Sequence, residues 1–463
     1  MKFLLIKPGD NKKSDLFSVT GPSNHPPLGL LSLGAMLESE GHTAEILDYY
    51  MEEISKEKLK NYLQSSDAVG MTVLTEDFKA AVDISVMIKE INPNITLIIG
   101  GPHCSFHKQR SLQDISRADI CVIGEGEYVI LDLVKYFEGE KKLADIHGIY
   151  YRDNGLIKSG KPLQVIDDLD ALPFPARHLV DKYDYAKLPW DKKSKKKVTS
   201  MITSRGCPFQ CRFCARYSNS IKNWGCRKRS AENVVREILE IDKKYGNVWI
   251  VDDNFLADTK RAHKILDMLL EIGTDINFLI EGVRVDSADR KLYEKMKKAG
   301  VKLMGFGIES GNQDVLDFYK KNVTLQQIRK ALGLANEMDF FTYGTFIFGA
   351  PMETKTHIEN TIKFANSLPL DFANFGELSY STGSDLWAEA VKNKIISKDE
   401  TYLIADSRRG LGNFTPDELT QYAKKAIKSF YIRPKYIFRQ THKAILRKDF
   451  SLLTNGIRFV TSL

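Results

Sequence analysis

The strongest constraint on the fold is an alternation of short strands and helices that occurs in two separate blocks of the chain. In residues 1–140, runs rich in Val, Ile and Leu alternate with segments of helical apolar spacing; the expected strands are 2–7, 43–48, 68–74, 96–101 and 120–124. Buried strands joined by helices predict a parallel sheet covered on both faces. This block is therefore predicted to be a doubly wound, Rossmann-like α/β domain that binds ligands beyond the carboxyl ends of its strands.

The alternation resumes in residues 197–395. Six strands are expected, each followed by a helix; they are 198–203, 247–251, 276–281, 302–308, 342–348 and 372–378. Repeated strand–helix units of this kind predict a partial (β/α)6 barrel of the TIM type. The active site of such a barrel lies in the loops at the carboxyl ends of the strands.

Two further segments complete the predicted organisation. Residues 141–196 contain a hairpin-like piece, a Pro-rich stretch and a run of lysines, and are expected to form a connector. Residues 396–463 are predicted to be a helical, basic extension. From Gln421 onwards there are ten Lys and Arg against one Asp, so this segment outweighs the net charge of +7 and the remaining chain is slightly acidic.

The composition indicates a cytoplasmic protein. No stretch approaches the roughly 20 apolar residues that span a bilayer, and the apolar start MKFLLIKP is too short for a signal peptide. Six cysteines are too few for a disulfide scaffold. Cys104, Cys121 and Cys226 are scattered and are expected to be small buried apolar residues.

The other three cysteines form a compact motif directly after the first strand of the second block. Cys207, Cys211 and Cys214 have the spacing C-x3-C-x2-C. Three thiolates on one loop can hold three irons of a cuboidal iron–sulfur cluster and leave the fourth iron open. Zinc is the alternative, because it also binds thiolates, but it requires four closed ligands; His178 and Cys226 are the available candidates for the fourth.

With an aromatic residue before its last cysteine, this motif resembles that of the radical S-adenosylmethionine superfamily. The resemblance implies that the open iron chelates S-adenosylmethionine, whose reductive cleavage gives a 5′-deoxyadenosyl radical that abstracts hydrogen. Phe213 would lie near the adenine. The ends of the later strands imply further contacts to S-adenosylmethionine from Asp252, Asn254, Arg284, Glu309, Ser310 and Gly349. In each case the alternative is an ordinary turn, for which Gly and Asp are common residues.

The resemblance extends to residues 1–140, which are similar to the cobalamin-binding domain of one branch of this superfamily. It implies cobalamin contacts from Gly29, Thr72, Leu74, Gly100, Gly101, Gly124 and Glu125. The D-x-H-x-x-G motif that supplies a histidine to cobalt in many cobalamin proteins is absent, although His25 and His103 lie near the expected rim. Two alternatives follow: the domain binds cobalamin without a histidine ligand, or it has lost cobalamin. A dinucleotide site is disfavoured, since no G-x-G-x-x-G follows the first strand.

The C-terminal segment extends the resemblance to one group of enzymes. Its stretch FYIRPKYI, residues 430–437, is similar to the tail of the branch that contains anaerobic tetrapyrrole cyclases and enzymes acting on hopanoids and tetraether lipids. Basic residues interleaved with Phe, Tyr and Ile fit a segment on an anionic bilayer, and so peripheral contact with the inner membrane surface. A helix packed on the barrel with a solvated basic face is the alternative, and no nucleic-acid partner is expected.

Together the motifs imply a cobalamin-dependent radical enzyme with a [4Fe-4S] cluster, S-adenosylmethionine and cobalamin as cofactors. The expected reaction is hydrogen abstraction from an unactivated carbon of an apolar or lipid-like substrate, followed by C-methylation. Cyclisation, carbon–carbon bond formation or oxidation is the alternative outcome. A flavodoxin or ferredoxin would supply the electron. A non-catalytic iron–sulfur electron-transfer protein is the alternative of another class.

Overall fold

The computed structural model describes residues 1–9, 25–185, 197–447 and 450, which form two compact units. The first unit is built mainly from residues up to 185, and the second mainly from those after 197. Most of the lysine run in the predicted connector, and the predicted extension beyond residue 450, lie outside the described residues.

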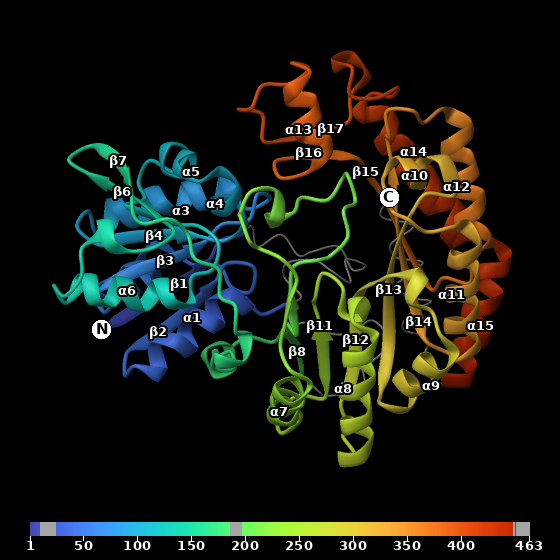
Figure 1. Ribbon diagram of the computed structural model, residues 1–463, viewed down its shortest axis with the longest axis horizontal. Helices are drawn as coiled ribbons and strands as arrows, with labels where there is room; N and C mark the ends of the chain where they lie inside the picture. Colours follow the sequence, from blue (N-terminus) through green and yellow to red (C-terminus); the bar gives the residue numbers. More distant parts are fainter. Residues whose placement is uncertain (10–24, 186–196, 448–449, 451–463) are drawn as a thin grey trace. The chain divides into compact units, whose positions relative to one another are not determined.

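The first unit contains a seven-stranded sheet (Figure 1). The first five strands pair in parallel, and β6 and β7 are added to the sheet by antiparallel pairing. Their order across the sheet is β2 (Thr43–Asp48), β1 (Lys2–Lys7), β3 (Ala68–Thr72), β4 (Thr96–Gly100), β5 (Ile120–Val122), β6 (Ile149–Asp153) and β7 (Leu156–Ser159). The hairpin β6–β7, expected in the connector, extends this sheet at the β5 edge.

Helices cover both faces of the first sheet. The side chains of β1 alternate between two cores, since Phe3 and Leu5 pack into one and Leu4 and Ile6 into the other. The first core is closed by α1 (Leu28–Ser39) and α6 (Glu127–Phe137); the second is closed by α2 (Lys56–Gln64), α3 (Phe78–Ile91), α4 (Pro102–His107) and α5 (Gln109–Asp114). The predicted doubly wound α/β architecture is confirmed.

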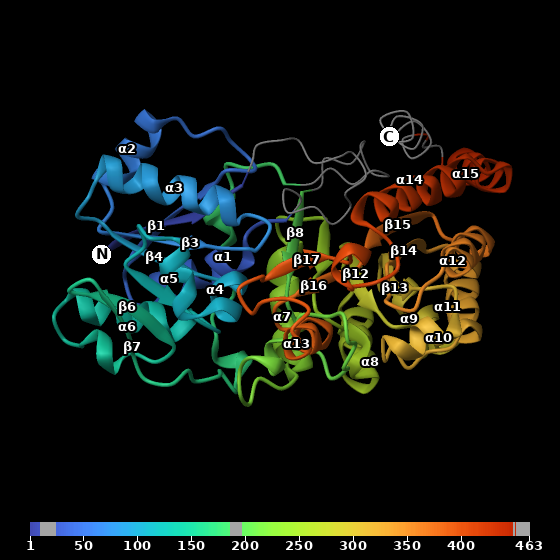
Figure 2. The same ribbon diagram turned by 90° about the horizontal axis from the view of Figure 1, so that it is seen from above.

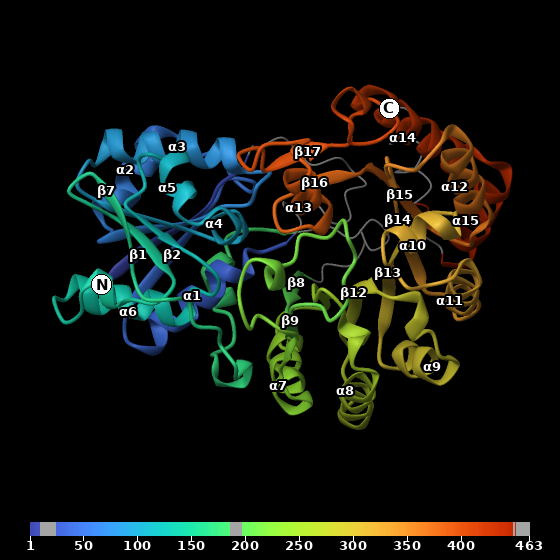
Figure 3. The same ribbon diagram turned by 45° about the horizontal axis from the view of Figure 1, so that its top comes forward.

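The second unit contains a six-stranded, entirely parallel sheet whose strands follow one another in sequence order. The strands are β8 (Val198–Met201), β11 (Asn247–Ile250), β12 (Asn277–Val283), β13 (Val301–Glu309), β14 (Phe341–Phe348) and β15 (Phe372–Glu377). The helices lie along the outer side of the sheet (Figure 3); they are α7 (Ala231–Asp242), α8 (Thr259–Ile272), α9 (Arg290–Lys298), α10 (Gln313–Phe318), α11 (Leu325–Glu337) and α12 (Lys355–Ser367). The predicted partial barrel is confirmed.

Side-chain caps define where the barrel helices begin. Ser230, Asp258, Asp289 and Thr324 each accept a hydrogen bond from the backbone amide three residues later, which satisfies one of the free donors of the first turn. Ser230, Asp258 and Asp289 end the segments that follow β8, β11 and β12, so these caps fix where the loops at the carboxyl ends of those strands stop. Those loops carry the candidate site.

A C-terminal segment follows the barrel. It comprises a small antiparallel pair, β16 (Ser379–Ser381) and β17 (Tyr402–Ile404), and the helices α13 (Asp385–Lys392), α14 (Pro416–Ile432) and α15 (Pro434–Arg447). No helix among the described residues combines the length and the hydropathy needed to cross a bilayer.

Candidate active site

The three-cysteine loop follows the first strand of the barrel. After β8 the chain forms β9 (Ser204–Arg205), which pairs with β10 (Arg227–Lys228), and then the loop of Cys207, Cys211 and Cys214. The Cys214 amide donates to the Cys211 carbonyl at 3.2 Å, which makes the second half of the loop a tight turn. The loop thus lies at the carboxyl end of the sheet, as predicted.

The thiols of the loop share one electrostatic environment. Burial of its thiol raises the pKa of Cys214 to about 12, although the residue has an exposed surface, and the nearby Asp253, Cys211 and Cys207 raise it further. The pKa of Cys207 is also raised by burial, with contributions from Asp253 and Cys211. Four neighbouring groups that would be anions together need a positive partner, which iron supplies.

A cuboidal cluster fits this donor set better than a single ion. Within the part of the chain that the structure describes, no three His, Cys, Asp or Glu side chains converge as ligands of one metal ion. A closed zinc site requires such convergence. In an iron–sulfur cluster each thiolate binds a different iron.

The cysteine loop is fixed to the segment that follows α10. The Arg212 amide donates to the Tyr319 carbonyl at 3.0 Å, and the Arg212 guanidinium lies 4.3 Å from the centre of the Phe318 ring. Phe213 packs edge-on against Tyr319, with their ring centres 5.0 Å apart. These contacts hold the loop in one orientation relative to β13 and α10.

A buried ion pair lies beside Phe213. The Nζ atom of Lys321 is 2.6 Å from Oε1 of Glu309 and 5.9 Å from the centre of the Phe213 ring. A Cβ atom on Gly307 would overlap with the Glu309 carboxylate and would lie 2.8 Å from the Lys321 Nζ atom, so a side chain there would displace the charged ends of the pair. Sequence reasoning found Glu309 but missed Lys321, because a lysine after a helix has no feature that separates it from a surface residue.

Arg284 belongs to the same group. Its guanidinium lies 3.6 Å from the centre of the Phe209 ring, and it donates to the Lys321 carbonyl at 2.9 Å and to Asp286. Three predicted residues, Phe213, Arg284 and Glu309, are therefore connected to one another through the cysteine loop and Lys321.

The predicted residues after β11 have distinct surroundings. Asp252 is buried, and its carboxylate accepts hydrogen bonds from the Thr203 amide at 2.6 Å and from the Ser204 hydroxyl at 2.6 Å. It therefore ties β11 to the start of the cysteine loop. Asn254 is also buried, and its Oδ1 atom has no hydrogen-bond partner within the described residues. Asp253, which sequence reasoning passed over, is near enough for its charge to raise the pKa of the Cys207 and Cys214 thiols.

Ser310 and Gly349 lie in local structural networks. The Ser310 hydroxyl is 3.2 Å from the hydroxyl of Thr361 on α12 and accepts from the Asn312 amide. Gly349 has a φ of 109°, and its amide donates to Glu353 at 2.6 Å. The structure therefore does not group these two predicted residues with Phe213, Arg284 and Glu309.

The inner face of the barrel sheet carries a carboxyl group that the sequence did not single out. Trp249, Leu279 and Leu303 are register partners on this face, which is opposite the helix-packed core, and Glu281 lies two residues beyond Leu279. Oε1 of Glu281 is buried and has no hydrogen-bond partner among the described residues. Burial raises the pKa of Glu281 to about 7. A charged residue inside an apolar strand was the available signal.

In the first unit, four of the predicted cobalamin residues, Thr72, Leu74, Gly100 and Gly101, lie at the carboxyl edge of β3 and β4. The Val73 amide donates to the Gly100 carbonyl at 2.7 Å, and Leu74 begins the turn that closes at Asp77. Gly101 has a φ of 99°, and a Cβ atom on it would lie 2.8 Å from Oγ1 of Thr72. Gly29 lies apart, exposed on α1 with open space around it.

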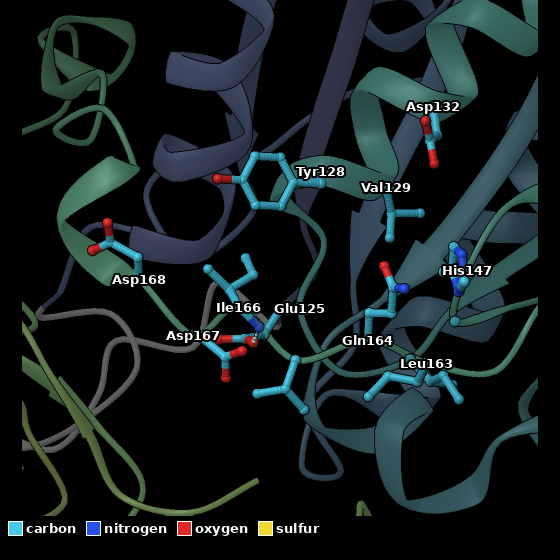
Figure 4. A pocket seen from close by; sticks show the side chains of 13 residues that line it. Glu125, Tyr128, Val129, Asp132, His147, Leu163, Gln164, Ile166, Asp167 and Asp168 are labelled. Carbon is cyan, nitrogen blue, oxygen red and sulfur yellow. Dashed lines mark hydrogen bonds between the residues drawn. The ribbon is translucent and has the colours of Figure 1, made fainter. Parts of the chain in front are cut away.

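Gly124 and Glu125 lie at the next strand end, beside a cavity of about 280 Å³ (Figure 4). Gly124 has a φ of 77°, and a side chain there would overlap with Leu163. The buried Glu125 carboxylate accepts from the Ile166 amide at 2.8 Å and lines the cavity with Tyr128 and His147. Glu125 thereby holds the chain after β7 against β5.

His103 is the histidine of the first unit that best fits a cofactor-facing role. Its ring stacks on Phe78 at 4.7 Å, and its Nδ1 atom is 3.4 Å from Oγ1 of Thr75. Its buried Nε2 atom has no partner within the described ranges. Burial lowers the pKa of His103 to about 3, so the ring is neutral, as a metal-binding imidazole must be. The unpaired nitrogen beside Gly101 fits cobalamin at this edge.

Comparison with known proteins identifies the family. Residues 201–365 match the radical SAM superfamily, and residues 16–134 match the B12 binding domain. The chain belongs to the radical S-adenosylmethionine superfamily, in the branch that carries a cobalamin-binding domain. It is an enzyme whose cofactors are a [4Fe-4S] cluster, S-adenosylmethionine and cobalamin.

Particular relatives are similar over most of their length. An uncharacterized methyltransferase of Pyrococcus horikoshii is 32% identical over 447 residues, which cover 95% of this chain and 94% of the relative. Cytidylyl-2-hydroxyethylphosphonate methyltransferase of Streptomyces wedmorensis is 26% identical, over 93% of this chain and 90% of the relative. The structure of the radical methyltransferase TsrM of Kitasatospora setae, solved with cobalamin and a [4Fe-4S] cluster, superposes with a TM-score of 0.69 at 17% identity, over 85% and 75% of the two chains, and shows the shared fold.

Proposed function

We propose that this enzyme transfers a methyl group to an unactivated carbon of a small-molecule substrate. The observation that carries the proposal is the presence in one chain of the three-cysteine loop, the Phe213–Lys321–Glu309 group packed against it, and a B12 binding domain. The similarity to two proteins named as methyltransferases supports methyl transfer as the outcome.

The residues of the second unit have separate roles in this proposal. Cys207, Cys211 and Cys214 hold the cluster, and Phe213 contacts the adenine of S-adenosylmethionine. Lys321 and Glu309 are the charged groups that bind its polar end, and Arg284 positions Lys321 through the Lys321 carbonyl. When bound, the cofactors supply an electron, a hydrogen-abstracting radical and a methyl group. The chain binds the cofactors and the substrate, orients them and excludes water.

The inner face of the barrel supports a substrate that carries polar groups. Glu281, Tyr343 and Thr345 are partly exposed on this face, whereas the alternating side chains of β14 toward the helices are buried. The sequence predicted an apolar or lipid-like substrate, and this face supports polar groups on that substrate. A lipid-like substrate with a polar head group agrees both with the polar side chains on the inner face and with the composition of the tail.

As in the superfamily generally, an external donor supplies the electron to the cluster. A flavodoxin or ferredoxin is the proposed donor for this chain. Cobalamin contacts from Thr72, Leu74, Gly100, Gly101, Gly124 and Glu125 are proposed on their shared position at the carboxyl edge of the first sheet.

The test is anaerobic reconstitution with iron, sulfide and hydroxocobalamin, followed by reduction with S-adenosylmethionine. The expected products are S-adenosylhomocysteine, a bound-corrin spectrum that changes to that of methylcobalamin, and 5′-deoxyadenosine that disappears in Cys211→Ala. Deoxyadenosine without S-adenosylhomocysteine would contradict methyl transfer and leave cyclisation or oxidation. A folded protein with neither product would contradict the enzyme assignment at this site.

A further inference from the structure

Helix α15 presents large apolar side chains to solvent along one side. Ile437, Phe438, Ile445 and Leu446 are 43%, 76%, 59% and 70% exposed. At 3.6 residues per turn these positions spread over one half of the helix surface, and Thr441 and the exposed His442 lie between the two pairs. We call these four residues the α15 outer face. The exposed Ile432, at the end of α14, precedes it.

The opposite side of α15 is firmly attached to the barrel. Gln440 donates to Oδ1 of the buried Asp371 at 2.8 Å, and the Nζ atom of Lys443 lies 3.0 Å from the same oxygen. The Tyr436 hydroxyl donates to the Asp371 carbonyl at 2.9 Å, and Arg439 donates to the Leu370 carbonyl. Because polar contacts to one strand end fix the helix, its apolar side is held outward.

Such a group of side chains is unusual on a folded surface. The other exposed large apolar residues of the described chain, such as Val86, Ile272 and Tyr402, are scattered over separate elements. Single exposed apolar residues are ordinary, whereas several large ones on one half of a helix mark a surface that another body covers.

The charges around the α15 outer face indicate what that body is. Lys424, Lys425 and Lys428 are exposed on α14, which runs on into α15 (Figure 2), and Lys435 is exposed at the start of α15. No Asp or Glu occurs between Gln421 and Lys448. A second copy of the chain would bring these lysines against their equivalents, which is repulsive. An anionic surface with an apolar interior complements both features.

We propose that the α15 outer face docks on an anionic lipid bilayer. Phe438, Ile445 and Leu446 would enter the boundary between head groups and acyl chains, while the lysines of α14 and Lys435 contact the head groups. The proposal goes beyond methyl transfer and does not depend on it. It assigns the predicted membrane contact to one helix face that is fixed to the barrel.

The test uses the reconstituted full chain and sedimentation with vesicles of phosphatidylcholine, with and without phosphatidylglycerol. We expect binding to the vesicles that contain phosphatidylglycerol, weaker at high salt. The double variant Phe438→Glu with Ile445→Glu should lower the partition coefficient by about tenfold or more, since apolar insertion is replaced by charge repulsion. The matched control is Ile272→Glu, which changes a residue 50% exposed on α8 and should bind as the unchanged protein does. Circular dichroism and the cluster absorption confirm folding of every variant.

Three results would overturn the proposal. The first is no binding to either vesicle. The second is a dimer, seen by analytical ultracentrifugation, that Phe438→Glu dissociates while vesicle binding is unchanged; the face would then bind a second copy. The third is loss of binding in a Leu452→Glu, Leu453→Glu variant but not in the α15 variant, which would place the contact in residues 451–463.

Discussion

Lys321 and Glu309 form an ion pair of 2.6 Å whose side chains are only 10% and 6% exposed, beside the aromatic residue of the cysteine loop. Glu309 has a φ of 66°, in the left-handed region that non-glycine residues rarely occupy. Such backbone strain is retained where surrounding contacts enforce it, and it is frequent at functional sites. The pair thus combines a desolvated charge of each sign with a strained backbone at the proposed S-adenosylmethionine site.

Removing one partner of this pair should destabilise the fold. Lys321→Met leaves the Glu309 carboxylate buried without its cation, and we expect a loss of about 3–5 kcal/mol in the free energy of unfolding. The double variant Lys321→Met with Glu309→Gln should recover most of this loss but still bind S-adenosylmethionine poorly. Urea unfolding and equilibrium dialysis of S-adenosylmethionine measure the two effects. Full recovery of binding in the double variant would show that the pair is only structural.

A side chain at Gly307 should disturb the ion pair of Lys321 and Glu309. In Gly307→Ala the added methyl overlaps with the Glu309 carboxylate, so we expect a loss of about 1–3 kcal/mol in stability and weaker S-adenosylmethionine binding. Gly305→Ala is the matched control on the same strand, because there the nearest atom would lie at an ordinary contact distance of 3.5 Å. Equal losses of stability and of S-adenosylmethionine binding in the two variants would argue against a special steric role for Gly307.

The stability contributed at Glu281 should depend on pH. Burial raises the pKa of Glu281 from 4.5 to about 7, so the folded state binds a proton more tightly than the unfolded state does. The contribution of Glu281 to stability therefore falls as the pH rises from about 4.5 to 7. Glu281→Gln should be more stabilising at pH 8 than at pH 5, by about 1–2 kcal/mol after allowance for partial exposure. Urea midpoints at the two pH values measure this, and a difference independent of pH would contradict it.

Asp371 should control the attachment of α15. Asp371→Asn weakens the ion pair with Lys443 and disturbs the bond to Gln440, so we expect a loss of about 3 kcal/mol and faster proteolysis within α15. Asp339→Asn is the control: Asp339 lies 4.0 Å from the same lysine, but its side chain is 58% exposed, and its loss should cost less than about 1 kcal/mol. Unchanged proteolysis in Asp371→Asn would show that other contacts hold the helix.

Gly101 should be necessary for cobalamin binding. Gly101→Ala imposes a positive φ on alanine and brings its methyl against Thr72, so the edge formed by β3 and β4 must shift. Gly41→Ala imposes a similar φ of 80° in open space and is the matched control. We expect both variants to lose about 1 kcal/mol from the backbone, but only Gly101→Ala to lose bound corrin absorbance. Equal corrin content in the two proteins would place cobalamin elsewhere.

The architecture was predictable from sequence because strand and helix periods repeat over long stretches. The register of the strands was not predictable, and neither was the addition of the hairpin β6–β7 to the first sheet. Both depend on pairing between segments far apart in the chain. The cysteine loop was visible because its three ligands are local in sequence.

The rest of the site depends on the directions in which side chains point, and the order of residues in the sequence does not show these directions. Asp252 and Asp253 are neighbours, yet the first binds Thr203 and Ser204 and the second raises the pKa of the thiols. Glu309 points to Lys321, whereas Ser310 points to Thr361 on α12. The left-handed backbone conformation of Glu309 separates the two directions. Lys321 reaches the site only because α10 returns the chain to the cysteine loop.

The six barrel strands form an open arc, in which β8 and β15 are the two end strands. A closed barrel has a radius set by strand number and stagger. An arc has no such closure condition, so small changes in twist between neighbouring strands alter its curvature while the strand ends keep their local geometry. The same cysteine loop and ion pair are therefore compatible with inner faces of different width, which gives this architecture a way to change substrate size without rebuilding its chemistry.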